Sequence, residues 1–180
     1  MHIKDIEASG WVKIKKNKYS CIKKNKIKEI DVNWKNIEKY DREEISQIKI
    51  ASFDIECMSA DGSFPQPHRD GDPVIQIGTT FNYYGKSECY YKHIVTLGSC
   101  DKIEGVDVES YDNESEVLLA WTRMIQKMNP DIITGYNIFG FDFKYLEARA
   151  KKLGIEHKFS ILGRVEEKSE FMEKQLSSSA

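Results

Sequence analysis

The stretch KIASFDIECM, residues 49–58, constrains the fold most, because it combines the pattern of a buried β-strand with two carboxylates. Phe53 and Ile55 supply apolar bulk, and Asp54 and Glu56 alternate with them. Successive side chains on a strand point to opposite faces, so the two carboxylates share one face and lie roughly 7 Å apart. The pattern predicts a strand that packs through one face and carries a carboxylate pair on the other.

This carboxylate pair has two interpretations. Carboxylates on one face repel each other unless a cation lies between them, and hard divalent cations prefer such oxygen ligands. Two-metal hydrolysis of a phosphodiester, with ions roughly 4 Å apart, needs three or four carboxylates from separate elements. Alternatively, a D-x-E pair at the end of a strand simply faces solvent.

A third candidate carboxylate is Asp142, at the start of a predicted helix in the stretch GYNIFGFD. The start of a helix contributes the positive end of a dipole. Asn137 lies in the preceding turn, where its amide can reach a phosphate, a sugar or Asp142, and Gly140 allows a tight approach. The alternative is that Asp142 is only a helix cap and that the neighbouring phenylalanines are only core residues.

Apolar periodicity in the rest of the chain predicts a mixed α/β layer fold. The expected order is β-β-β-α-β-α, over residues 46–57, 74–85, 87–97, 113–128, 131–137 and 139–154. Asn113, with Glu116 three residues on, predicts the start of the first helix, and Asn129-Pro130 predicts its end. The stretch 58–73 is rich in Gly, Pro and Asp and predicts a loop or an extended hairpin tip.

The chain is predicted to divide into a small β-rich N-terminal flank, residues 1–47, and a compact domain, residues 48–180. Residues 11–30 are dense in lysine, and partial alternation there predicts short strands or an edge hairpin. The lysines form either a solvated face that discourages edge pairing or a patch that contacts phosphates. Residues 31–47 are polar and predict a connector.

Composition narrows the class of function. The formal net charge is −2, so charge alone indicates no nucleic-acid partner. The four cysteines form no C-x-x-C pair, which argues against a disulfide framework or a zinc site and favours a reducing, intracellular compartment. No segment is long and apolar enough to span a membrane, and the N-terminus lacks the apolar region of a secretory signal.

The motifs taken together resemble those of a known family. The chain is similar to the 3′–5′ proofreading exonuclease domain of family B DNA polymerases in four stretches, which are SFDIEC, DGSFPQP, GDPVIQIGTT and NPDIITGYNIFGFDFKYLEARAKKLG. Within the family, it is most similar to delta-type enzymes of eukaryotes and their relatives in large DNA viruses. DIE matches the first exonuclease motif, and YNIFGFD matches the second, N-x-x-x-F-D. The likeness covers residues 48–163 and, more weakly, the N-terminal flank.

The resemblance implies a ribonuclease H-like α/β fold, truncated in this chain, with a two-metal site for Mg²⁺ or Mn²⁺. It implies that Asp54, Glu56 and Asp142 are catalytic residues and metal ligands, and that Asp142 contacts the metal directly or through water. The implied reaction is hydrolysis of the 3′ terminal phosphodiester of DNA.

The resemblance also implies three substrate-binding residues. Asn137 would orient the substrate strand, and Phe141 would support the site or the terminal nucleotide. Phe64, in DGSFP, matches a loop aromatic that lies against bases near the 3′ end. A stacking role fits, because aromatic side chains bind unpaired bases without sequence preference. A loop residue folded back onto the domain fits equally.

Partners and a location follow from the same resemblance. The implied parent is a DNA-directed DNA polymerase that excises mismatched 3′ ends, and its substrate here is the single-stranded 3′ primer end of DNA. A sliding clamp and accessory subunits would bind other parts of that parent. The implied location is a site of DNA replication, in the nucleus or at a viral replication site, with no membrane partner and no secretion.

One departure from the family pattern is the absence of the third motif, Y-x-x-x-D, on a later helix. Tyr145 is followed four positions later by Arg149, and no Asp occurs beyond residue 145. We therefore expect the chain to be a fragment of a longer polymerase and to be inactive alone, since the fourth carboxylate and the polymerase palm are missing. The alternatives are a catalytically incomplete module that binds DNA or metal or serves as a scaffold, and a stand-alone ribonuclease H-like nuclease.

Overall fold

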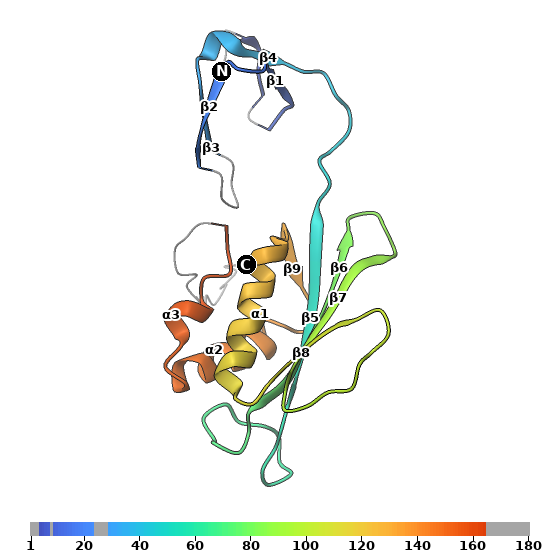
Figure 1. Cartoon of the computed structure of the whole chain (residues 1–180), viewed down its shortest axis with the longest axis vertical. Helices are drawn as coiled ribbons and strands as arrows, with labels where there is room; N and C mark the ends of the chain where they lie inside the picture. Colours follow the sequence, from blue (N-terminus) through green and yellow to red (C-terminus); the bar gives the residue numbers. More distant parts are fainter. Residues whose placement is uncertain (1–3, 8, 24–28, 165–180) are drawn as a thin grey trace, which may run out of the picture. The chain divides into compact units, whose positions relative to one another are not determined.

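The structure is a computed structural model that describes residues 4–7, 9–23 and 29–164. The chain forms two compact units, Met1–Ser46 and Gln47–Ala180. Figure 1 draws the first unit in shades of blue and the second in colours from cyan to orange-red.

The first unit is built from two pairs of short antiparallel strands. Its elements are β1 (Val12–Ile14), β2 (Tyr19–Lys23), β3 (Glu29–Val32), a 3₁₀ helix (Trp34–Asn36) and β4 (Ile37–Lys39). β1 pairs with β4, and β2 pairs with β3. The short strands predicted in residues 11–30 are confirmed. The connector predicted for residues 31–47 is wrong in part, because β4 lies within it; three residues are too few to show strand alternation.

The lysine-rich part of this unit contains a tight turn between β1 and β2. Lys18 N donates a hydrogen bond to Lys15 O at 3.1 Å, and Asn17 at the turn has a φ of +67°. The side chains of Lys13, Lys15, Lys16 and Lys18 are all exposed. Exposure is compatible with a solvated face and with a phosphate-contacting patch, so both interpretations stay open.

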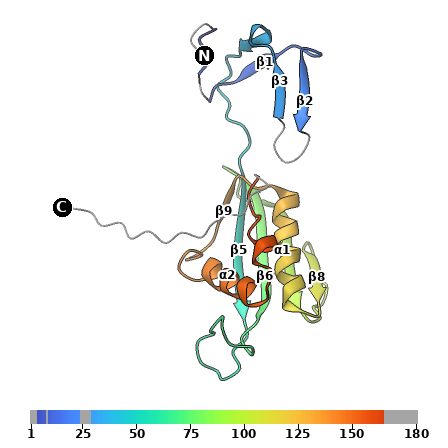
Figure 2. The same cartoon turned by 90° about the vertical axis from the view of Figure 1, so that its left-hand side faces the viewer.

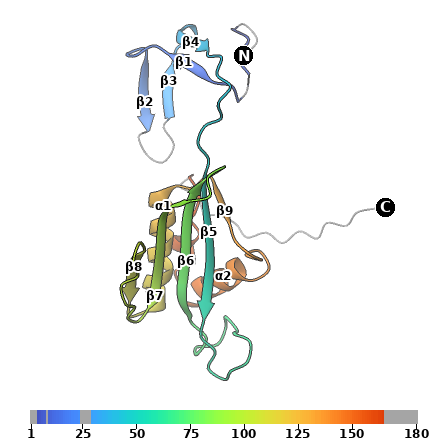
Figure 3. The same cartoon turned by 90° about the vertical axis from the view of Figure 1, so that its right-hand side faces the viewer.

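The second unit is built around a mixed five-stranded sheet, which is drawn in Figures 1 and 3. The strands are β5 (Lys49–Cys57), β6 (Val74–Tyr83), β7 (Cys89–Leu97), β8 (Asp107–Tyr111) and β9 (Ile132–Thr134), in the order β8-β7-β6-β5-β9. β6 is antiparallel to both β5 and β7, whereas β8 and β9 pair in parallel with β7 and β5 at the two edges. The predicted turn at Gly85-Lys86 joins β6 to β7, and Gly85 has a φ of +77° there.

The described part of the second unit contains three α-helices, and they lie on one face of the sheet (Figures 1 and 2). They are α1 (Glu114–Met128), α2 (Asp142–Lys152) and α3 (Glu156–Phe159). Phe53 of β5 packs against Trp121 of α1 and Phe143 of α2, with ring centroids 5.0 Å apart in each pair. Trp121 also stacks on Phe159 of α3. The core therefore lies between β5 and the three helices, and the α/β prediction is confirmed. Among the described residues, no helix has the length and apolarity to cross a membrane.

The first helix begins and ends where the sequence predicts. The side chain of Asn113 accepts a hydrogen bond from Glu116 N at 2.9 Å, which caps α1. Asn129 follows the helix in the left-handed conformation, with a φ of +51°. β8 and α3 were not expected, because five residues in an edge strand and four in a helix are too short to show a clear period.

The second helix begins three residues later than the predicted residue 139. Asn137 has a φ of +52°, and its carbonyl accepts hydrogen bonds from Gly140 N at 2.9 Å and Phe141 N at 3.0 Å. These bonds close a separate turn, so the helix starts only at Asp142. Residues 131–137 were predicted as a short strand that runs into a turn, and this is confirmed, since β9 ends at Thr134 and Asn137 lies in the turn that follows.

Candidate functional site

The exposed face of β5 carries two of the predicted carboxylates. Asp54 and Glu56 are exposed, whereas Phe53 and Ile55 are buried, at 3% and 6% exposure. Gly78 of β6 pairs with Asp54, and a Cβ at Gly78 would meet no atom within 4 Å. Residues that oppose each other on neighbouring strands point to the same face. The sheet therefore leaves open space beside the Asp54 carboxylate.

Asp142 is the first residue of α2 and reaches β5 from the other side. It is 3% exposed, and its Oδ1 accepts a hydrogen bond from Ile55 N at 3.2 Å. β9 pairs with β5 only as far as Ser52, so the strand edge beyond that point has no neighbouring strand. A buried backbone N–H needs a partner, and the carboxylate of Asp142 supplies one. This bond fixes Asp142 next to the β5 carboxylates.

Asp54 and Asp142 form a close pair of like charges. Burial raises the pKa of Asp142 above its ordinary value, and the charge of Asp54 and a hydrogen bond between the two side chains raise it further. Within the described ranges, no group of three or more His, Cys, Asp or Glu is arranged to hold a metal ion. The structure thus brings two of the three predicted ligands together and leaves Glu56 outside that pair.

The donor set of this pair fits a hard divalent cation. Carboxylate oxygens are the ligands that Mg²⁺ and Mn²⁺ prefer. A cation between Asp54 and Asp142 would offset the charge of Asp54, which adds to the effect of burial in raising the pKa of Asp142. Glu56 is exposed on the same face of β5, where its side chain is free to rotate toward a cation.

The turn before α2 places Asn137 by close packing of backbone. A Cβ at Gly135 would collide with the carbonyl oxygen of Phe53, so the chain passes directly against β5 there. A Cβ at Gly140 would collide with the side-chain amide of Asn137. A side chain at either position would therefore displace its neighbour, the Phe53 carbonyl at Gly135 or the Asn137 amide at Gly140. The Asn137 amide is exposed and lies against Gly140.

An aromatic pair connects the loop of residues 58–73 to this turn. Phe64 is 67% exposed, and its ring packs edge-on against Phe141 with centroids 5.3 Å apart. Phe141 in turn contacts Tyr145, also at 5.3 Å. Phe64 is therefore folded onto the domain through Phe141 and still keeps most of its surface open. Neither of the two roles considered for Phe64 is excluded by this geometry.

Comparison with known protein families assigns the chain to one family. Over residues 1–180 it matches the family model for DNA polymerase family B, exonuclease domain. The chain belongs to this family. The resemblance predicted from the sequence is confirmed, and family membership together with the mixed sheet and flanking helices gives this family B chain a ribonuclease H-like fold.

Known proteins of two groups are similar to this family B chain. It is 41% identical over 156 residues to a DNA polymerase of Acanthamoeba polyphaga mimivirus, which covers 85% of the chain and 9% of the relative. It is 38% identical over 169 residues to the DNA polymerase delta catalytic subunit of Mesocricetus auratus, which covers 89% of the chain and 15% of the relative. It is 47% identical over 121 residues to the same subunit of Arabidopsis thaliana, which covers 67% of the chain and 11% of the relative. The chain thus spans at most 15% of the length of these relatives.

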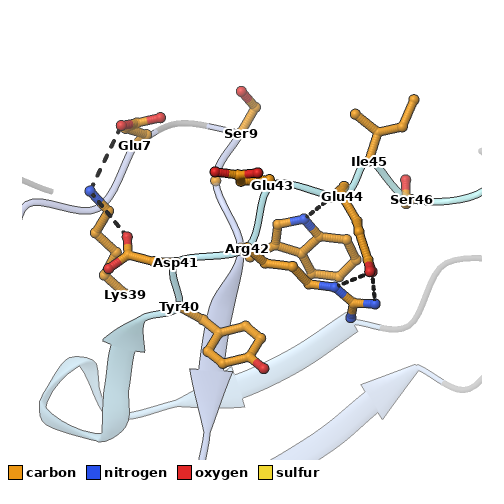
Figure 4. A pocket seen from close by; sticks show the side chains of 12 residues that line it. Glu7, Ser9, Lys39, Tyr40, Asp41, Arg42, Glu43, Glu44, Ile45 and Ser46 are labelled. Atoms are coloured by element: carbon orange, nitrogen blue, oxygen red, sulfur yellow. Dashed lines mark hydrogen bonds and ion pairs between the residues drawn. The ribbon is translucent and has the colours of Figure 1, made fainter.

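The first unit of the family B chain contains a pocket of about 930 Å³, lined by residues 7, 9–11 and 39–46 (Figure 4). Several of its charged side chains pair with one another, Lys39 with Glu7 and Asp41, and Arg42 with Glu44. Arg42 lies over the Trp11 ring, 4.9 Å from the centroid, and its Nε donates to Glu44 at 2.7 Å. Trp11 Nε1 donates to Glu44 O at 2.6 Å. We therefore place the candidate site at β5 and α2 and not in this pocket.

No motif in the sequence indicates how the loop of residues 58–73 is held. Tyr145 and Arg149 were considered only as a failed match to the third motif, yet both are buried and donate hydrogen bonds to this loop. Asp72 is fully buried at the end of the loop. The available signal was the position of Arg149 three residues after Leu146, on the face of the helix that packs.

Proposed function

We propose that this chain is the exonuclease-bearing part of a replicative family B DNA polymerase that hydrolyses the 3′ terminal phosphodiester of DNA. In this proposal, residues 1–47 belong to the N-terminal domain and residues 48–180 to a partial 3′–5′ exonuclease domain. The proposal is carried by one observation: Asp54 of β5 and Asp142 of α2 form a carboxylate pair beside open space at Gly78.

The proposed metal ligands are Asp54, Glu56 and Asp142, with Mg²⁺ or Mn²⁺ as the cofactor. Bound divalent cations supply Lewis-acid chemistry, which lowers the pKa of an attacking water and stabilises the leaving oxygen of the phosphodiester. Asp142 is held in place by the Ile55 N–H, so it is preorganised. Asp54 and Glu56 project from a strand whose other face is packed in the core, so their backbone is fixed while their carboxylates stay open to solvent.

The proposed substrate-binding residues are Asn137, Phe141 and Phe64. The Asn137 amide is exposed and can donate to a phosphate or sugar oxygen. Phe64 rests on Phe141 and offers its free surface to the terminal base. A mispaired 3′ end is easier to separate from its template than a paired one, so a site for single strands selects mismatched ends.

In this proposal, other parts of the polymerase complete the exonuclease site. No Y-x-x-x-D follows Asp142 in the sequence, so we propose that the fourth carboxylate comes from outside these residues and that the chain alone has little activity. The proposed partners are DNA and, for the rest of the polymerase, a sliding clamp and accessory subunits. The proposed location is a site of DNA replication, in the nucleus or at a viral replication site.

The test uses the polymerase that carries residues 1–180 and a primer with a mismatched 3′ end. Replacing Asp54 with Asn, or Asp142 with Asn, is expected to lower the excision rate at least about a hundredfold, because charge stabilisation by a bound cation is worth several kcal/mol. DNA synthesis from a matched primer is expected to continue. Glu88→Gln, an exposed residue of the second unit, is the control. Undiminished excision by Asp54→Asn would show that these ligands are wrongly assigned.

A binding module without turnover is the second candidate for the chain on its own. It is favoured by the missing third motif and by the separation of Glu56 from the Asp54–Asp142 pair. Calorimetric titration of Mn²⁺ into the chain, followed by incubation with a single-stranded oligonucleotide, tests whether the chain on its own is such a module. Metal binding without release of nucleotides supports the module, and rapid release contradicts it.

A further inference from the structure

The loop of residues 58–73, which joins β5 to β6, is held by side chains of α2. Tyr145 Oη donates to Asp72 O at 2.8 Å. Arg149 Nη1 donates to Pro67 O at 3.0 Å and to Arg69 O at 2.6 Å. Lys152 Nζ donates to His68 O at 2.6 Å. Positions spaced by four and three residues share one face of a helix, so a single face of α2 holds four carbonyls of this loop.

Arg149 is the centre of this contact and is itself locked in place. It is 3% exposed, and its guanidinium pairs with Glu114 of α1, where Arg149 Nε donates to Glu114 Oε1 at 2.7 Å and Nη2 donates to Oε2. Glu114 Oε1 also accepts from Val74 N, at the start of β6, at 2.9 Å. The planar fork of Arg serves a carboxylate on one side and two carbonyls on the other, which the single ammonium of Lys cannot do.

Hydrogen bonds within the loop brace it between these attachment points. Asp72 accepts hydrogen bonds from Ala60 N at 3.0 Å and from Gln66 N at 2.8 Å, and these bonds tie the two limbs of the loop together. Arg69 Nη1 donates to Asp61 Oδ2 at 2.8 Å. A loop braced in this way moves as one piece, so the attachment to α2 also sets the position of Phe64.

Both ends of α2 therefore contribute to one arrangement. Its first residue is Asp142, and the residue before it, Phe141, receives the Phe64 ring. Its last two turns hold the loop that carries Phe64. Because a helix of this length is stiff, the position of the loop aromatic is tied to that of the Asp142 carboxylate.

We propose that Arg149, assisted by Tyr145 and Lys152, is a positioning residue that fixes Phe64 relative to Asp142 and so sets how tightly the exonuclease site holds a 3′ end; this rests on the proposed function. Arg149 touches neither substrate nor metal in this role. Its effect passes through the loop, which predicts that its loss has no additional consequence once the Phe64 ring is gone.

The test is a double-mutant comparison in the polymerase that carries this chain, with an unpaired 3′ end as substrate. Phe64→Ala is expected to raise KM about tenfold, since stacking on an aromatic ring is worth about 1–3 kcal/mol per base. Arg149→Lys is expected to raise KM at least threefold with kcat within twofold, which is the pattern of lost binding shared by ground and transition states. In the Phe64→Ala background, Arg149→Lys is expected to change KM by less than about 1.5-fold. Equal effects of Arg149→Lys in both backgrounds would overturn the proposal.

A variant at the surface tests the same attachment without the risk of unfolding that a buried substitution carries. Lys152 holds the same loop from a partly exposed position and also pairs with Asp70 at 2.6 Å, so Lys152→Ala is expected to raise KM about twofold without unfolding the domain. Lys151→Ala is the matched control, because Lys151 pairs with Glu147 on α2 itself, at 2.6 Å. An unchanged KM for Lys152→Ala, or the same rise for Lys151→Ala, would contradict the proposal.

Hydrogen exchange separates a failure of this proposal from a failure of the proposed function. The amides of Ala60 and Gln66 report the loop directly. Arg149→Lys is expected to raise their exchange rates at least fivefold, while amides in the last two turns of α1, far from Glu114, keep theirs. Faster exchange in an enzyme that excises no DNA would reject the exonuclease role and retain the loop attachment. Unchanged exchange in an enzyme that excises normally would reject the positioning role alone.

Discussion

The Asp142 carboxylate binds a backbone N–H at the edge of β5 and also lies next to the carboxylate of Asp54. Its Oδ1 accepts the Ile55 N–H beyond the end of the β9 pairing, and a buried N–H without a partner costs about 1–3 kcal/mol. Its proximity to Asp54 raises its pKa in addition to the rise caused by burial. A substitution at Asp142 is therefore expected to affect folding and the proposed cation binding together, whereas one at the exposed Asp54 is expected to affect the proposed cation binding alone.

Gly140 makes room for Asn137, and this is open to a direct test. Gly140→Ala places a methyl group against the Asn137 amide, so we expect the amide to be displaced and the free energy of unfolding to fall by about 1–3 kcal/mol. Urea unfolding of the chain measures the change. Gly78→Ala is the control, because its Cβ meets no atom within 4 Å, and its free energy of unfolding is expected to stay the same or rise. An equal loss in both variants would contradict the packing argument.

Asp72 predicts a pH dependence of the loop. Hydrogen bonds from the Ala60 and Gln66 amides hold the pKa of Asp72 below its ordinary value. A lowered folded-state pKa stabilises the fold above the unfolded pKa of about 3.9, and the contribution is lost as the pH falls through the folded-state pKa. We therefore expect Asp72→Asn to be less stable than the wild type at pH 7 and to approach it below pH 4. Denaturant unfolding across this range is the measurement.

The control for this pH prediction is Asp101→Asn, which changes an exposed carboxylate elsewhere in the same unit. It is expected to leave the difference between pH 7 and pH 3 unchanged. A difference between wild type and Asp72→Asn that stays constant across the range would show that the Asp72 charge does not stabilise the loop.

At the scale of elements, the parts that the sequence predicted are those with a long, regular pattern. β5, β6 and β7 run for nine or ten residues each, and α1 carries both a cap and a clear apolar face. Short elements such as β8 and α3 lack such a pattern. The site followed the same rule: Asp54 and Asp142 come from recognisable motifs, whereas the Arg149 attachment joins residues far apart in the chain and becomes visible only in three dimensions.

The cap of α1 gives a quantitative prediction at this scale. Asn113→Ala removes the side-chain oxygen that accepts from Glu116 N, so the free energy of unfolding is expected to fall by about 1 kcal/mol. Asn113→Asp retains an acceptor at that position and is expected to remain within about 0.5 kcal/mol of the wild type. Thermal unfolding followed by circular dichroism compares the three. A larger loss for Asp than for Ala would be incompatible with capping.

The whole molecule consists of two units with different charge. Residues 1–46 contain 12 Lys and Arg against 8 Asp and Glu, and residues 47–180 contain 15 against 21. The overall net charge of −2 is the sum of these two opposite values, which is why net charge alone indicated no partner. Between the last strand of the first unit and β5, residues 40–48 form no helix or strand. We interpret this segment as a link between two separately packed bodies.

Limited proteolysis tests this division. A glutamate-specific protease is expected to cut first after Glu43 or Glu44, which are exposed in the segment without secondary structure. The product that starts near residue 45 is expected to retain the circular dichroism of the second unit. Trp11→Ala is expected to speed cleavage, because Trp11 donates to Glu44 O and lies under Arg42. First cuts within residues 49–162 would contradict the division.

Because α2 connects the Asp142 carboxylate to the attachment of the loop, insertions and deletions within this helix are expected to be selected against in evolution. Each added residue in a helix turns everything beyond it by about 100°, so one insertion between Asp142 and Arg149 would carry Arg149 away from Glu114 and from the carbonyls of Pro67 and Arg69. No substitution elsewhere in the helix would return both Asp142 and Arg149 to their positions. We expect insertions and deletions among relatives to accumulate in the exposed connection between β7 and β8 and to be absent from these eight positions.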